Sequence, residues 1–218
     1  QEELNRLGFF NPEALGVNPM PDPNTGNVDI EYIVEEKPAD QIEMSGGYGA
    51  GRFVGQVGVS FVNFSTRGIK DLSTWSPLPT GDGQKIQLQA QFYGTAYQTY
   101  RMMFQEPWLG GKKPNAFTTS FFYSQNTPTE YTTVIENDTV SVESRMEMIG
   151  FSIGLGKRLQ WPDDYFTIQN SFNINRYDTE EWMGGGIPQG LNGIQTDINF
   201  SSTIRRNSVF NPIYPRSG

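Results

Sequence analysis

The chain has 218 residues, a formal net charge of −8 and no cysteine or histidine. Its mean hydropathy of −0.51 and the lack of any apolar run of about 18 residues exclude a helical membrane protein. The acidic balance argues against a nucleic-acid partner, because phosphate binding needs clustered basic residues. Aromatic residues make up 13% of the chain and glycine occurs 24 times, so we expect an ordered protein rich in strands and turns.

The first 40 residues are predicted to form a small soluble α/β unit. Residues 1–10 predict the end of a helix that stops at Gly8. Residues 18–27 are dense in proline, asparagine and glycine and predict a turn region. Residues 27–37 alternate apolar and acidic side chains, which predicts a half-buried strand. Residues 37–40 are predicted to be the linker that leaves this unit.

From residue 41 the pattern changes to repeated alternation of apolar and polar residues. Each alternating segment predicts a strand, because successive side chains of a strand point to opposite faces. The segments are about ten residues long, the length that a tilted strand needs to cross a bilayer. These segments are residues 41–49, 53–64, 85–92, 99–105, 116–125, 150–156, 165–175 and 193–205.

The composition of the two strand faces favours a membrane protein. In residues 85–92, Ile86, Leu88 and Phe92 alternate with glutamines. A soluble β-sandwich would bury such apolar faces against each other and carry many charges outside. Here the polar faces are mostly Gln, Ser, Thr, Asn and Gly, and only 18% of residues are charged. We therefore predict a mainly β, transmembrane antiparallel β-barrel with apolar side chains toward lipid and polar ones toward a wet lumen. The sandwich remains the alternative.

Charged residues within the predicted strands are few. We assign them to the polar faces, where they favour ion pairs that hold the barrel wall. A catalytic carboxylate pair remains an alternative that spacing alone does not exclude. The residues are Glu43, Arg101, Glu147, Asp197 and Arg205.

Tryptophans occur in the connections that follow alternate strands. Trp75, Trp108 and Trp161 are predicted to lie at one rim of the barrel, within an aromatic girdle at the membrane interface. Tyr214 is predicted to belong to the same set of interfacial aromatic residues.

Several stretches together cover nearly the whole chain and carry a family resemblance. They are GFF-P followed by TGNVDIEYIVEEK, then PLPTGDGQK, YQTYRMMFQEPWLGGKKPN and the closing NPIYPRSG. They resemble the BamA family of outer-membrane assembly proteins, in the form found in the Bacteroidota. The first is similar to the end of the last polypeptide-transport-associated (POTRA) domain of that family, and the others to its first barrel strands and to a short family turn. The resemblance implies that residues 1–37 are the C-terminal part of a periplasmic POTRA domain. Residues 38–218 would be the N-terminal half of an outer-membrane barrel of about sixteen strands.

The resemblance also implies a function for the first barrel strand. In the family this strand meets the last one at a weakly paired lateral gate, where it pairs with a strand of an incoming protein. The residues concerned are Gln41, Ile42, Glu43, Met44, Ser45, Gly46, Gly47, Tyr48 and Gly49. The glycines fit a weakly packed strand, although a tight hairpin would also account for them.

The implied partners are nascent outer-membrane proteins, accessory outer-membrane lipoproteins, lipid and lipopolysaccharide. No cofactor, metal or enzymatic activity is expected. The alternatives are a related exporter with POTRA domains and a small closed outer-membrane porin.

Overall fold

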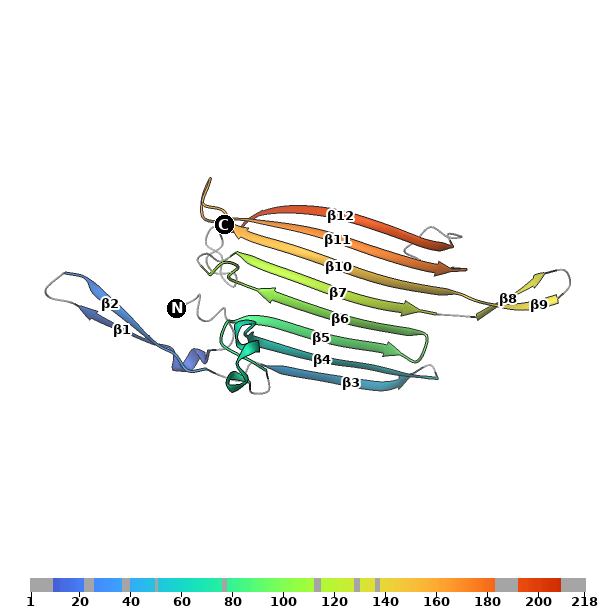
Figure 1. The fold of residues 1–218 in the computed structure, drawn as a ribbon, viewed down its shortest axis with the longest axis horizontal. Coiled ribbons are helices and arrows are strands. Elements are labelled where there is room, and N and C mark those ends of the chain that lie inside the picture. The colour runs from blue at the N-terminus through green and yellow to red at the C-terminus, as the bar shows by residue number, and fades with distance from the viewer. Residues whose placement is uncertain are drawn as a thin grey trace. The chain divides into compact units, whose positions relative to one another are not determined.

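The computed structural model describes residues 10–21, 26–36, 40–49, 51–75, 78–111, 115–127, 130–135, 138–182 and 192–208. These residues form strands and three short 3-10 helices (Figure 1). The helices are η1 (Pro12–Ala14), η2 (Arg67–Lys70) and η3 (Leu72–Thr74). Within the described ranges no helix is long and apolar enough to cross a membrane.

One antiparallel sheet contains all eight of the strands that alternation predicts after residue 40. Figure 1 shows them in the order β12-β11-β10-β7-β6-β5-β4-β3, so each strand lies beside the next one of the sheet along the chain. The predicted strands are confirmed, and the structure extends several of them by a few residues. Their bounds are β3 (Gln41–Gly49), β4 (Arg52–Phe64), β5 (Gln84–Tyr93), β6 (Tyr97–Glu106), β7 (Ala116–Asn126), β10 (Arg145–Arg158), β11 (Phe166–Glu180) and β12 (Gly193–Arg206).

The two ends of this sheet are β3 and β12. Each of them pairs with a single neighbour among the strands that the structure describes. Closure of the sheet into a barrel, and the domain boundary at residues 37 and 38, stay predictions.

A separate hairpin near the N-terminus corrects one prediction. Strand β1 (Gly16–Pro21) pairs with β2 (Val28–Ile33), although the residues from 18 onward were predicted to be a turn. Proline has no backbone N–H to donate. Because Pro19 and Pro21 are two residues apart, both of their nitrogens can point away from β2. The strand in 27–37 is confirmed as β2, but its predicted burial is wrong: all six residues are exposed. A two-stranded ribbon has too little surface to bury its own side chains. The predicted helix end at Gly8 lies outside the described residues.

A second hairpin occupies the connection between β7 and β10. Strands β8 (Glu130–Ile135) and β9 (Asp138–Glu143) pair from Glu130 with Glu143 to Ile135 with Asp138. The connection is rich in polar and acidic residues, and it is not among the alternating segments predicted above. Its β-branched residues, which favour strands, are the signal that predicts this hairpin.

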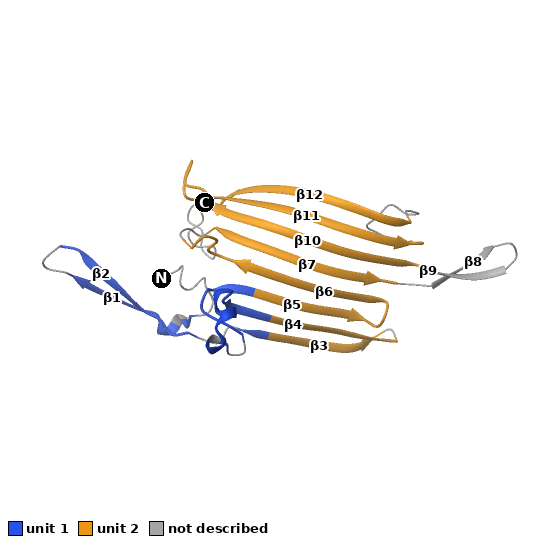
Figure 2. Ribbon diagram, in the orientation of Figure 1, with its two compact units in different colours: residues 1–41, 60–85 blue, residues 42–59, 86–218 orange. Residues whose placement is uncertain are grey.

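The chain divides into two compact units (Figure 2). Unit 1 comprises residues 1–41 and 60–85, and unit 2 comprises residues 42–59 and 86–218. Unit 2 therefore holds most of the eight-stranded sheet.

Unit 1 contains a buried polar network in the connection between β4 and β5. The Ser65 hydroxyl donates to Asp82 Oδ2 at 2.7 Å and accepts from the Gly68 N–H at 3.0 Å. The Gln84 side chain accepts from the Thr66 N–H at 2.8 Å and donates to Thr66 Oγ1 at 3.0 Å. Because buried polar atoms are costly when unpaired, this network holds the connection in one conformation. Thr66 and Gly68 of this network lie at the start of η2.

Candidate functional site

The register of the strands divides the sheet into two faces of different chemistry. One cross-strand row runs Met102, Phe121, Phe151, Ile174 and Ile198, from β6 to β12. The adjacent row on the opposite face runs Met103, Ser120, Ser152, Asn173 and Asn199. We call the first the apolar face and the second the polar face. This division confirms the alternation that the sequence predicts.

The apolar face carries large side chains that are exposed. Leu88 is 42% exposed, Phe92 38% and Ile198 62%, so these side chains are not packed beneath a second sheet. In the whole described part of the chain, only Phe64, Ala96, Trp182 and Pro79 are buried apolar residues. A soluble sandwich of this size buries most of its large apolar side chains. The exposed apolar face therefore favours a surface that meets lipid.

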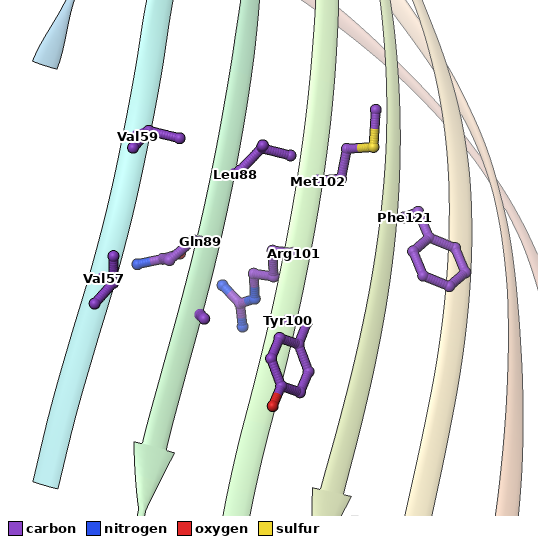
Figure 3. A pocket seen from close by; sticks show the side chains of 9 residues that line it. Val57, Val59, Leu88, Gln89, Tyr100, Arg101, Met102 and Phe121 are labelled. Carbon is purple, nitrogen blue, oxygen red and sulfur yellow. The ribbon is translucent and has the colours of Figure 1, made fainter. Parts of the chain in front are cut away.

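A shallow apolar pocket on this face joins β4 to β7. Its volume is about 330 Å³, and Figure 3 shows Leu88 and Tyr100 among its lining side chains. Val57 and Val59 of β4 line it together with Met102 of β6. The pocket thus places the apolar side chains of β4 and β5 on the same face as those of β6 and β7.

The polar face is held by hydroxyl pairs between strands. Thr99 and Ser124 are 3.0 Å apart between their oxygens, and Ser120 and Ser152 are 2.7 Å apart. The Phe122 ring, also on this face, covers Gly150 so closely that a Cβ there would overlap it. Short hydroxyl and amide side chains dominate, as expected of a surface that faces water rather than lipid.

The register corrects the predicted position of one charged residue. Glu147 lies opposite Asp178 and is two residues before Ile149, so it belongs to the apolar face, near the end of β10. It pairs there with Arg145. Its acidic character led the sequence reading to place it on the polar face, but the parity of the strand decides the face.

The predicted ion pairs of the polar face are not found in the described residues. Asp197, Arg101 and Arg205 lie on that face, as the register of β6 to β12 shows. Glu43 lies there too, because a Cβ on Gly58 would contact it. The three ion pairs that the described residues form are Arg67–Asp82, Arg145–Glu147 and Arg206–Asp163, and none joins two of these polar-face residues.

Aromatic side chains lie near both ends of the strands of unit 2. Trp108 follows β6 and Trp161 follows β10, two strands that run in the same direction because both are antiparallel to β7. These two tryptophans therefore lie at one end of the sheet, and they are 42% and 83% exposed. Trp75 is 41% exposed and follows η3 in unit 1, with its indole N–H donating to the Gly68 carbonyl at 3.2 Å. Tyr214 lies outside the described residues.

The opposite strand ends carry aromatic residues that were not among the predicted interfacial aromatic residues. Tyr100 and Tyr123 are cross-strand partners whose rings stack with centroids 6.3 Å apart. Tyr48 and Phe53 flank the turn between β3 and β4 and meet edge to face at 5.9 Å. Only the register of β6 and β7 brings Tyr100 and Tyr123 together, whereas a local turn brings Tyr48 and Phe53 together. Aromatic groups at both ends of an apolar band are typical of membrane-spanning sheets.

Strand β3 is the candidate pairing strand, and its predicted bounds are confirmed as Gln41–Gly49. All nine of its residues are exposed, with Ile42 at 79% and Met44 at 80%. A Cβ added at Gly47 or Gly49 would meet no atom within 4 Å, so no described side chain covers the face of β3 on which these two glycines lie. An end strand with one described neighbour presents unpaired backbone N–H and C=O groups along its other side.

No protein-family model matches this chain, and no curated protein matches it. The assignment of function therefore depends on the geometry of the sheet and on the resemblance of the sequence motifs.

Proposed function

We propose that this chain is part of an outer-membrane β-barrel assembly protein similar to the BamA family, acting through β3. The observation that carries the proposal is an end strand with an open edge, in a sheet whose apolar face is exposed and bordered by aromatic residues. The proposed location is the outer membrane, with the N-terminal residues in the periplasm. The proposed partners are nascent outer-membrane proteins, accessory lipoproteins and lipid.

The proposed mechanism needs no covalent chemistry. The open edge of β3 offers backbone donors and acceptors to a strand of an incoming protein, which would otherwise have to bring unpaired groups into lipid. Each backbone hydrogen bond that forms between β3 and the incoming strand removes the cost of placing an unpaired N–H and C=O group in lipid. The exposed glycines keep side-chain packing on β3 weak, so its pairing can exchange.

The length of the apolar face also supports a role for β3. On β12 the apolar-face positions run from Ile194 to Ile204, roughly 33 Å of strand and roughly 23 Å of membrane depth at a 45° tilt. On β3 they run from Ile42 to Tyr48, roughly 20 Å of strand and roughly 14 Å of depth. A shorter apolar band thins the adjacent bilayer, which lowers the cost of moving polar turns of a client across it.

A cross-linking experiment tests the pairing strand directly, because the chain has no cysteine of its own. Ser45→Cys in the full-length protein is expected to form a disulfide with a cysteine in the terminal strand of a client barrel that is stalled during assembly. Ser171→Cys is the matched control, since Ser171 lies on β11, which pairs on both sides. Equal cross-linking at both positions, or none at Ser45, would contradict the proposed role of β3.

Depletion of the protein in its native cell separates this function from that of a porin or an exporter. We expect the levels of many unrelated outer-membrane barrels to fall together, because each needs a pairing edge to insert. Quantitative proteomics of the outer membrane measures the levels, and periplasmic proteins serve as the control. Loss of a single exported protein would favour the exporter, and unchanged barrel levels would contradict the insertase.

A further inference from the structure

Four basic residues gather at one end of β10 and β12, around the connection from β10 to β11. They are Lys157, Arg158, Arg205 and Arg206. Asp163 and Asp164 are the acidic residues of the connection from β10 to β11. These four positive and two negative charges sum to a local charge of +2, although the whole chain carries −8.

The register assigns two of these cations to the apolar face. Lys157 lies opposite Ile168, which lies opposite Ile204. Arg206 lies opposite Phe166, two residues farther along the same face. Arg158 and Arg205 both lie opposite Thr167, on the polar face. Figure 1 shows the three strands side by side. Lys157 and Arg206 therefore stand where the apolar face of β10 to β12 ends.

The Arg206 side chain is held in place by its neighbours. Its Nε donates to Asp163 Oδ2 at 3.1 Å, and its Nη1 donates to the Ser208 hydroxyl at 3.2 Å. The guanidinium carbon lies 5.6 Å from the centre of the Tyr165 ring and 5.9 Å from that of Phe166. An arginine ordered in this way loses less conformational entropy when it binds an anion.

Lys157 is exposed and has no ion pair with any residue that the structure describes. It is separated from Arg206 by one intervening strand, which places the two backbones roughly 10 Å apart across the sheet. Both side chains are long enough to approach one anion above β11. A single phosphate group fits this arrangement, because it accepts from an ammonium and a guanidinium together.

We propose that Lys157 and Arg206 bind the phosphate of an anionic phospholipid, whose acyl chains lie along Ile168, Ile204 and Phe200. The inference rests on the proposed function, because it requires the apolar face to meet acyl chains. Charge complementarity selects the phosphate, and the apolar residues next to the two cations select a lipid over a soluble anion.

The test uses the full-length protein in phosphatidylcholine vesicles that contain phosphatidylglycerol. After gentle extraction, native mass spectrometry titrates the binding of phosphatidylglycerol to wild type and to Lys157→Gln. We expect Lys157→Gln to weaken binding about fivefold, the effect of one cation near an anionic lipid. Lys157→Arg should restore it. Arg205→Gln is the matched control, because Arg205 precedes Arg206 on β12 but lies on the polar face. This variant should leave the affinity for phosphatidylglycerol unchanged.

Equal affinities of wild type and Lys157→Gln would overturn the inference, as would an equal loss in Arg205→Gln. Competition by inorganic phosphate at constant ionic strength would assign the site to a free anion instead. Co-flotation of the protein with the vesicles after a urea wash is measured in the same samples. Failure to float would contradict the membrane location itself, whereas flotation with unchanged lipid affinity would contradict only the phospholipid site.

Discussion

Replacing Phe172 with arginine is expected to lower the free energy of unfolding from a bilayer by about 2–4 kcal/mol. Phe172 lies near the middle of β11 on the apolar face, between Ile153 of β10 and Phe200 of β12, and is 41% exposed. A guanidinium at this depth must stay in hydrocarbon or draw water and headgroups inward, and both cost free energy. Urea titration of the protein in vesicles, followed by tryptophan fluorescence, measures the change.

The matched control for this variant is Asn173→Arg. Asn173 is the next residue and lies on the polar face, between Ser152 and Asn199. An arginine there would face water, so we expect a change of about 0.5 kcal/mol or less. Equal losses in the two variants would show that neither face meets lipid. A larger loss in Asn173→Arg would mean that the two faces had been assigned the wrong way round.

Replacing Gly150 with alanine is expected to destabilise the protein by about 1–3 kcal/mol. Gly150 lies opposite Phe122 on one side and Asn175 on the other. A Cβ at this position would overlap the Phe122 ring and lie 2.7 Å from Asn175 Oδ1. Phe122 would have to leave its position over the glycine, so packing between β7 and β10 would be lost. The same urea titration measures the loss.

Gly154→Ala is the control for this second variant. Gly154 lies on the same strand and the same face, and a Cβ there would meet Thr118 at an ordinary 3.8 Å. We expect no loss of stability. The double variant Phe122→Ala with Gly150→Ala should lose less than the sum of the two single variants, because the overlap is then absent. Equal stability of Gly150→Ala and Gly154→Ala would contradict the packing argument.

The sequence predicted the eight strands of the sheet well because the signal for each strand is local. In residues 85–92 the alternation of Ile86 and Leu88 with glutamines identifies both the strand and its two faces. The local composition gave a wrong prediction for β1, where residues typical of turns lie in a paired strand. Pro19 and Pro21 mark turns in most contexts, yet here they lie in a hairpin strand where neither needs to donate to its partner.

Other features depend on pairing between distant residues. Tyr100 and Tyr123 are far apart in the chain, and only the register of β6 and β7 stacks their rings. Glu147 was assigned to the wrong face because its charge suggested the polar one, whereas its parity with Ile149 decides where it points. The cations Lys157 and Arg206 lie on the same face, on either side of β11, only because β10 and β12 both pair with β11.

By itself, the sequence determined the positions of the strands after residue 40 and the chemistry of their two faces. Both follow from the two-residue period of a strand, which every short segment contains. The tertiary structure decided the register, and with it the aromatic pairs, the glycine under Phe122 and the cations beside the apolar face. Register depends on hydrogen bonds between residues that are far apart in the chain, so no local pattern contains it.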